Sequence, residues 1–143
     1  MKRIHPSSIV DSGAELADGV EIGPFCTVGP HVRLGEGVVV RSHAVVTGHT
    51  EVGAGTMIFP FATVGEMPQD VKYKGEPTRL AIGARNMIRE QVSIHPGTPT
   101  GGGTTTVGDD NLLLVNVHIG HDCHVGSHVI LANNVMLAGH VVV

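Results

Sequence analysis

The 143-residue chain is poor in aromatic residues, with no tryptophan, one tyrosine and three phenylalanines. A core built on large rings is therefore excluded, and the interior must consist of aliphatic side chains in thin layers. Only 15% of the residues are charged, and nine basic residues stand against thirteen acidic ones. This balance excludes a strongly basic protein, and we expect no nucleic-acid partner.

The sequence also has few cysteines and no long apolar segment. Cys26 and Cys123 lie far apart and match no disulfide or metal-binding pattern. No run of 18 apolar residues is present, so we expect no membrane span. No apolar stretch follows the charged start MKRIHPSS, so we expect no secretory signal. Two unpaired cysteines indicate a reducing compartment, and we expect the protein to be cytoplasmic.

What the sequence has in abundance is glycine, 20 of 143 residues, and an aliphatic residue at every sixth position. A glycine often follows the aliphatic residue directly, as at Gly23 and Gly29. A small or branched residue comes four places after the aliphatic residue, as at Cys26 and Ala44. A helix needs spacings of three and four and a long strand a spacing of two, so neither explains this period. The aliphatic residues of the repeat are Ile4, Val10, Leu16, Ile22, Val28, Leu34, Val40, Val46, Val52, Ile58 and Val64, then Ile82, Ile88 and Ile94, and then Val107, Leu113, Ile119, Val125, Leu131, Leu137 and Val143.

A period of six predicts a short strand followed by a turn, with three such units closing a triangular coil of about 18 residues. Stacked coils pair their strands in parallel, and the aliphatic and small residues point inward. We therefore expect Val28, Val46 and Ile119 to be buried, and Cys26 and Cys123 to be unpaired inside. The sequence predicts an all-β fold, a single parallel β-helix domain over residues 1–143.

The repeat is interrupted twice. Residues 66–81 keep the phase but supply no aliphatic residue at positions 70 and 76, whereas residues 95–106 shift the phase by one residue. Both segments are rich in glycine, proline, threonine or charge, so we predict that both leave the coil as loops. Ligand contacts concentrate on loops that a rigid scaffold holds.

Five of the ten histidines fall between positions 118 and 140. Ile119 and Leu137 are one coil apart, so we expect His121, Asp122 and His140 to project outward near one edge. An imidazole beside a carboxylate can act as a general base on a hydroxyl group. Two alternatives remain open. Surface positions of a β-helix can simply tolerate histidine, and clustered histidines can bind zinc.

Two other features could contact ligands. The glycines at 101–103 follow no strand-to-helix pattern and so favour a flexible loop over a phosphate-binding loop. Five of the nine basic residues lie between Lys72 and Arg89. Such a patch can meet phosphates or an acidic carrier protein, or it can form the solvated surface of a loop.

Five stretches of the chain closely resemble UDP-N-acetylglucosamine 3-O-acyltransferases, the enzymes that begin lipid A synthesis in Gram-negative bacteria. The resemblance runs along essentially all 143 residues and includes both loops. It is more specific than the hexapeptide repeat, which many acyltransferases share, and it implies that the β-helix is left-handed. The stretches are IGPFCTVGPHV, QDVKYKGEPTR, IREQVSIH, GDDNLLLVNVHIGHDC and ILANNVMLAGH.

The resemblance implies transfer of a 3-hydroxyacyl chain from acyl carrier protein to the 3-hydroxyl of UDP-N-acetylglucosamine, with no metal and no cofactor. It assigns the general base to His121 and the support of that base to Asp122. The backbone N–H of Gly139 would steady the thioester oxyanion. The residues that the resemblance places at the substrate are Asp70, Lys72, Gln69, His95, His118 and His140.

The resemblance also implies a homotrimer with active sites between subunits. Family members continue into further coils and a C-terminal helical region, so we expect these residues to be the β-helical part of a longer protein. Two other functions remain open. One is a related sugar N- or O-acyltransferase that uses another acyl donor, and the other is a catalytically incomplete β-helix that serves only as a scaffold.

Overall fold

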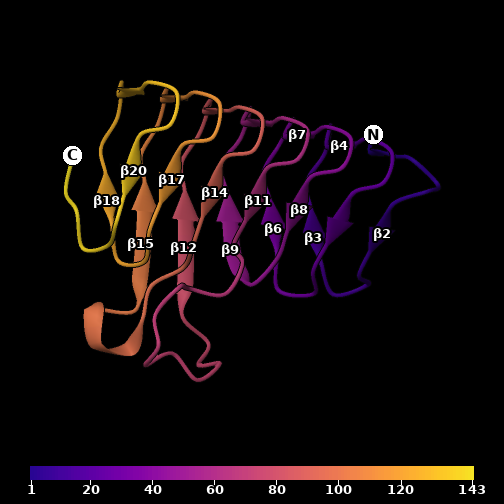
Figure 1. The fold of residues 1–143 in the computed structure, drawn as a ribbon. Helices are drawn as coiled ribbons and strands as arrows, with labels where there is room; N and C mark the ends of the chain where they lie inside the picture. Colours follow the sequence, from indigo (N-terminus) through magenta and orange to yellow (C-terminus); the bar gives the residue numbers. More distant parts are fainter.

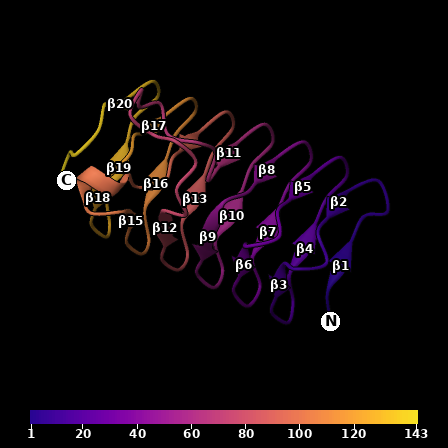
Figure 2. The same ribbon diagram turned by 90° about the horizontal axis from the view of Figure 1, so that it is seen from below.

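A computed structural model describes all of residues 1–143 and shows a left-handed parallel β-helix, as predicted. Triangular coils stack along one axis, and the two termini lie at opposite ends of the stack (Figures 1 and 2). One short 3₁₀ helix, η1 (Pro99–Gly101), interrupts the strands. No helix is long and apolar enough to cross a membrane.

Each face of the stack is one parallel sheet, to which every coil adds one strand. Sheet A contains β1 (Arg3–Ile4), β4 (Glu21–Ile22), β7 (Val39–Val40), β10 (Met57–Ile58), β13 (Met87–Ile88), β16 (Leu112–Leu113) and β19 (Ile130–Leu131). Sheet B contains β2 (Ile9–Val10), β5 (Thr27–Val28), β8 (Val45–Val46), β11 (Thr63–Val64), β14 (Ser93–Ile94), β17 (His118–Ile119) and β20 (Met136–Leu137). Sheet C contains β3 (Glu15–Leu16), β6 (Arg33–Leu34), β9 (His49–Val52), β12 (Arg79–Ile82), β15 (Thr104–Val107) and β18 (His124–Val125).

The six-residue repeat sets the register of all three sheets. In sheet B, Val28 pairs with Val46, and Ile94 pairs with Ile119 in later coils. Aliphatic side chains therefore stack in columns inside the prism. Val28, Val46 and Ile119 are at most 1% exposed, which confirms their prediction. The last aliphatic residue of the first strand, Ile4, is 43% exposed because only one neighbouring coil covers it.

The two cysteines lie in this interior. Cys26 and Cys123 are both buried and unpaired, as the small inward position of the repeat predicts. Burial raises the pKa of both thiols, which keeps them protonated and unreactive. They are core residues.

Glycine follows the aliphatic residue because successive coils approach closely at their corners. A Cβ atom added to Gly108 would lie 2.6 Å from the carbonyl oxygen of Gly126 in the next coil. No larger residue fits there without moving the backbone.

Both predicted loops leave the stack, but each is shorter than expected. The first covers residues 66–78, because β12 already begins at Arg79 and the Leu80 side chain, 1% exposed, enters the core. The second covers residues 95–103, because β15 begins at Thr104 and Thr105 is fully buried. Both loops project from the same edge of the prism, below β12 and β15 in Figure 1.

Strand β5 has one exposed and one buried residue, so we predict that the same substitution has very different effects on stability at the two positions. Replacing buried Val28 with Asp places an unpaired charge in a thin apolar core, and we expect it to lower the free energy of unfolding by more than about 4 kcal/mol. The same change at exposed Thr27 should cost less than about 1 kcal/mol. Urea denaturation followed by circular dichroism measures both variants. Equal losses of stability would show that the strand does not face the core as described.

Candidate active site

Four chain segments lie side by side at the edge where sheet B turns into sheet C. Each follows a strand of sheet B, and those strands are neighbours in the order β11, β14, β17, β20. We call this the B–C edge. Its segments are the loop 66–78, the loop 95–103, the turn 120–123 and the turn 138–141. Both loops that break the repeat are therefore stacked next to the turns that carry His121 and His140.

The turn after β17 holds a histidine–carboxylate pair. Nδ1 of His121 lies 2.9 Å from Oδ2 of Asp122 and is hydrogen-bonded to it. Asp122 has a left-handed backbone conformation, with φ of 62°. Its side chain is 0% exposed, whereas that of His121 is 15% exposed.

Asp122 lies at the edge where we expected it to project outward, but its side chain is covered by protein instead of being exposed. The loop 95–103 folds over this carboxylate, and Thr98 occupies the space that solvent would take. The backbone N–H of Thr98 donates to Oδ1 at 2.9 Å, and its Oγ1 donates to Oδ2 at 2.6 Å. The backbone N–H of Asp122 in turn donates to Oγ1 of Thr105 at 2.9 Å.

These hydrogen bonds hold a charge inside the protein. Burial alone would raise the pKa of Asp122, but the hydrogen bonds from the Thr98 hydroxyl, from His121 and from the Thr98 backbone N–H outweigh it. The pKa of Asp122 is lowered below its ordinary value of 3.8. Asp122 is therefore an ionised carboxylate at neutral pH.

An ionised carboxylate only accepts hydrogen bonds, so Nδ1 of His121 must carry the proton of the neutral ring. Nε2 then has a free lone pair. A Cβ atom added to Gly139 would lie 3.0 Å from this Nε2, so glycine lets the backbone of the next turn approach the ring closely. The backbone N–H of Gly139 donates no hydrogen bond within the chain. A base and a free donor thus lie next to each other.

His140 lies on the solvent side of this pair, as predicted, with a side chain that is 58% exposed. Its ring stands edge-on to that of His121 at 4.9 Å between centroids. His121, Asp122 and His140 offer three potential metal ligands within 4.8 Å of one another. Both oxygens of Asp122 already accept hydrogen bonds, and a metal would have to displace His121 from Oδ2. The donor set therefore fits a hydrogen-bonded base better than a zinc site.

Two further histidines, His95 in the second loop and His118 in β17, lie beside this edge with ring centroids 4.9 Å apart and are uncharged at neutral pH. Burial, with smaller effects from His118 and His121, lowers the pKa of His95 to about 4. Burial, and then His121, also lowers the pKa of His118. Nδ1 of His118 is hydrogen-bonded to Oγ of Ser93 at 2.7 Å, whereas the buried Nδ1 of His95 has no partner within the chain. Both rings can bind a neutral polar ligand without adding charge.

The predicted substrate residues of the first loop are brought near the pair through Thr98. Asp70, Lys72 and Thr98 line one small hollow of about 40 Å³. The loop is shaped locally by the backbone N–H of Lys72, which donates to Oδ1 of Asp70 at 3.0 Å. Gln69 is exposed and does not line this hollow.

The glycines at 101–103 do not lead from a strand into an α-helix, as those of a phosphate-binding loop do, and their loop carries its own hydrogen bonds. The carbonyl oxygen of Thr98 accepts from the N–H groups of Gly101 at 3.1 Å and Gly103 at 2.9 Å, which closes the loop on itself. A Cβ atom on Gly101 would collide with the carboxylate of Asp122. The glycine run therefore lets the loop pack directly on the buried charge.

The basic patch is partly neutralised within the chain. Arg85 pairs with Asp110, and Arg89 pairs with Glu90. The other basic residues of the patch, Lys72, Lys74 and Arg79, form no ion pair within the chain. They lie in the first loop and at the start of β12, beside the B–C edge.

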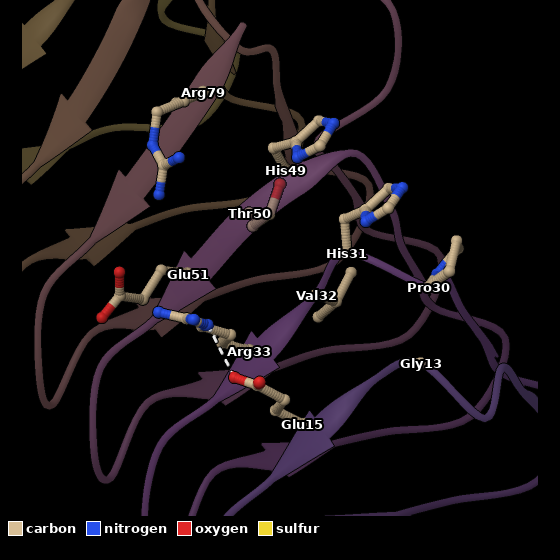
Figure 3. A pocket seen from close by; sticks show the side chains of 10 residues that line it. All are labelled: Gly13, Glu15, Pro30, His31, Val32, Arg33, His49, Thr50, Glu51 and Arg79. Carbon is tan, nitrogen blue, oxygen red and sulfur yellow. Dashed lines mark ion pairs between the residues drawn. The ribbon is translucent and has the colours of Figure 1, made fainter. Parts of the chain in front are cut away.

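A further hollow, of about 230 Å³, lies on the outer face of sheet C and was not predicted from the sequence (Figure 3). His31 and His49 stack there at 4.3 Å between ring centroids, and Arg79 lines the same hollow. His31 and His49 are 18 residues apart, which is one coil, and this spacing could have predicted that they lie next to each other. Glu15 in this hollow is paired with Arg33 and not with a histidine. The hollow therefore lacks a histidine–carboxylate pair like that of His121 and Asp122.

Comparisons with known proteins agree with this fold. The sequence pattern of the bacterial transferase hexapeptide family (six repeats) matches residues 13–48 and 104–139, half of the chain. The chain is 58% identical over 142 residues to an acyl-[acyl-carrier-protein]–UDP-N-acetylglucosamine O-acyltransferase of Paraburkholderia xenovorans (strain LB400). This match covers 99% of the chain and 54% of the relative.

Two solved structures show the same similarity. The UDP-N-acetylglucosamine O-acyltransferase of Moraxella catarrhalis RH4 is 49% identical with a TM-score of 0.96, over 98% of this chain and 55% of that one. The UDP-N-acetylglucosamine acyltransferase of Francisella novicida is 42% identical with a TM-score of 0.95, over 97% of this chain and 51% of that one. The chain thus spans about half the length of the relatives it matches.

The lowered pKa of Asp122 predicts a pH-dependent contribution to stability. Because the folded pKa lies below the ordinary value of 3.8, the ionised carboxylate stabilises the fold above that value. The contribution is lost as the pH falls through the folded pKa. We expect Asp122→Asn to lower the free energy of unfolding most at neutral pH, with a difference from the unsubstituted protein that shrinks below about pH 4.

Urea denaturation at a series of pH values measures this difference. The control is Asp18→Asn, because the Asp18 side chain is exposed and makes no hydrogen bond within the chain. A cost of Asp122→Asn that stays the same from pH 7 to pH 3 would contradict a buried, ionised Asp122.

Proposed function

We propose that this chain, which belongs to the bacterial transferase hexapeptide family, forms the β-helical part of an acyltransferase. The enzyme would transfer a 3-hydroxyacyl chain from acyl carrier protein to the 3-hydroxyl of UDP-N-acetylglucosamine, the first step of lipid A synthesis. The names of the relatives in the comparisons support this acceptor and this donor.

The observation that carries the proposal is the His121–Asp122 pair. Acyl transfer to a hydroxyl group needs a base, because a sugar hydroxyl is a poor nucleophile while it keeps its proton. A buried carboxylate that holds Nδ1–H and leaves Nε2 free is the arrangement by which serine hydrolases orient their histidine. Here the hydroxyl belongs to the substrate instead of to the protein.

In the proposed reaction, Nε2 of His121 takes the proton of the 3-hydroxyl as the oxygen attacks the thioester carbonyl. Asp122 stabilises the imidazolium that forms, and the N–H of Gly139 donates to the oxyanion of the tetrahedral intermediate. The intermediate collapses as the carbon–sulfur bond breaks. His121 returns its proton to the departing thiolate of the carrier, so that the ester and a free thiol are the products.

We assign the remaining residues to substrate binding. Asp70 offers a hydrogen-bond acceptor and Lys72 a cation beside the hollow that they share with Thr98. These two side chains match the hydroxyl groups and the phosphates of a sugar nucleotide. Gln69 can contact the same ligand from the exposed side of the loop. His95 and His118 offer neutral polar atoms to the sugar, and the exposed His140 lies where the substrate enters.

Two partners follow from this function. The unpaired cations Lys74 and Arg79 would meet the acidic carrier protein beside the B–C edge. The enzyme would also associate with copies of itself as a homotrimer. This is supported by an apolar row on the outer face of sheet A, formed by Val39, Met57, Met87, Leu112 and Ile130. The two unpaired cysteines suit a reducing compartment, so we propose that the protein works in the cytoplasm.

The role of His121 can be tested in the complete gene product. His121→Ala should lower kcat by about 10²–10⁴-fold, the usual contribution of a positioned base, while the fold and sugar-nucleotide binding persist. The control is His124→Ala, since His124 is exposed on sheet C and its Nδ1 is hydrogen-bonded to Oγ1 of Thr106, away from the pair. An acyl-transfer assay and calorimetry with UDP-N-acetylglucosamine give the two readouts. Equal losses in both variants, or abolition of activity by chelators, would refute the general-base role.

The apolar row predicts that association depends on sheet A. We expect the protein to sediment as a trimer at micromolar concentration. Ile130→Asp, which places a charge on a side chain that is 68% exposed in the single chain, should weaken association by about tenfold or more. Thr27→Asp on sheet B serves as the matched control. A monomer, or a trimer that Ile130→Asp leaves unchanged, would contradict this interface.

A further inference from the structure

Thr98 directs its hydroxyl group to a distant carboxylate instead of to its own backbone. It is the N-cap residue of η1, a position where threonine normally bonds the open N–H groups of the following turn. No such side-chain cap is present. The hydroxyl instead donates to Oδ2 of Asp122, which lies 24 residues later in the sequence. Thr98 is 1% exposed, so this hydroxyl has no access to water.

The contact determines how the carboxylate faces its histidine. Oδ2 accepts from both Thr98 Oγ1 and His121 Nδ1, while Oδ1 accepts from the Thr98 backbone N–H. Three donors in different directions leave the carboxylate one orientation. The close packing of Gly97 and Gly101 also restricts it, because a Cβ atom on either would clash with its oxygens.

We propose that Thr98 is a positioning residue for the general base: its hydroxyl holds Asp122 so that Oδ2 keeps His121 in the Nδ1–H form. This inference rests on the proposed function for its catalytic meaning. Thr98 also lines the hollow that contains Asp70 and Lys72. The residue that orients the base therefore borders the site proposed for the sugar nucleotide.

The test compares Thr98→Val with Thr98→Ser in the complete gene product. Valine keeps the shape of threonine, suits its extended backbone (φ −122°, ψ 156°), and keeps the N–H donor to Oδ1. It removes only the hydroxyl. We expect kcat to fall by about 10- to 100-fold with KM for the sugar nucleotide changed less than about twofold, because a hydrogen bond to a charged group is lost. Serine should restore kcat to within about threefold.

The matched control is Thr106→Val. It removes another threonine hydroxyl that is bonded to an imidazole, at 2.8 Å from Nδ1 of His124. We expect this variant to keep its kcat. If Thr98→Val does not fold, Thr98→Ala is compared with Thr98→Ser in its place.

A second measurement needs no activity. Nitrogen-15 NMR of the ring of His121 reports its tautomer. We expect the Nδ1–H form in the unsubstituted and serine proteins, and a mixture of tautomers in the valine variant. If the valine variant keeps both its kcat and the Nδ1–H form, the proposal is wrong. If the unsubstituted protein transfers no acyl group, the proposed function fails, while the NMR comparison still decides what Thr98 does.

Discussion

Each coil of this protein must repeat the path of the coil before it, because its parallel strands pair only while the six-residue register is kept. Extra residues can be accommodated only at a corner, where the chain can leave the prism and return to the same column. Both insertions, 66–78 and 95–103, leave at the B–C edge and rejoin at β12 and β15. The constraint that builds the core therefore also gathers two loops beside the turns of His121 and His140.

The site consists of a charge buried by one of those loops. An ionised carboxylate inside a protein is costly unless it is hydrogen-bonded on every side. Thr98 and His121 together give Asp122 three hydrogen bonds, and the glycines at 97 and 101 let the loop approach closely enough to cover the carboxylate. A rigid scaffold and a closed loop thus produce an oriented imidazole with one free nitrogen. Such preorganisation is what acid–base catalysis requires of a protein.

Much of the fold could be predicted from the sequence, since the repeat, outside its two interruptions, determines which side chains face inward. The proximity of His121, Asp122 and His140 could also be predicted, because His121 and Asp122 are adjacent and His140 lies one coil of 18 residues after Asp122. The burial of Asp122 could not, because its partner Thr98 lies in a loop where the repeat is broken. The return to strand at Arg79 and Thr104 was missed because each loop was taken to end only at the next aliphatic residue of the repeat, Ile82 or Val107. Leu80 and Thr105 stand two places before those residues, at the inward small position of the repeat. The assignment of substrate roles depended on resemblance, not on periodicity.

The central claim is that a buried, ionised Asp122 holds His121 with its proton on Nδ1 and its lone pair on Nε2. Neutron diffraction from a deuterium-exchanged crystal near neutral pH tests this most directly, because it locates the exchangeable hydrogens of both side chains. The account predicts deuterium on Nδ1 of His121 and on Oγ1 of Thr98, and none on Nε2 of His121 or on the carboxylate of Asp122. Deuterium on Nε2 with a bare Nδ1, or a deuterated Asp122, would contradict it.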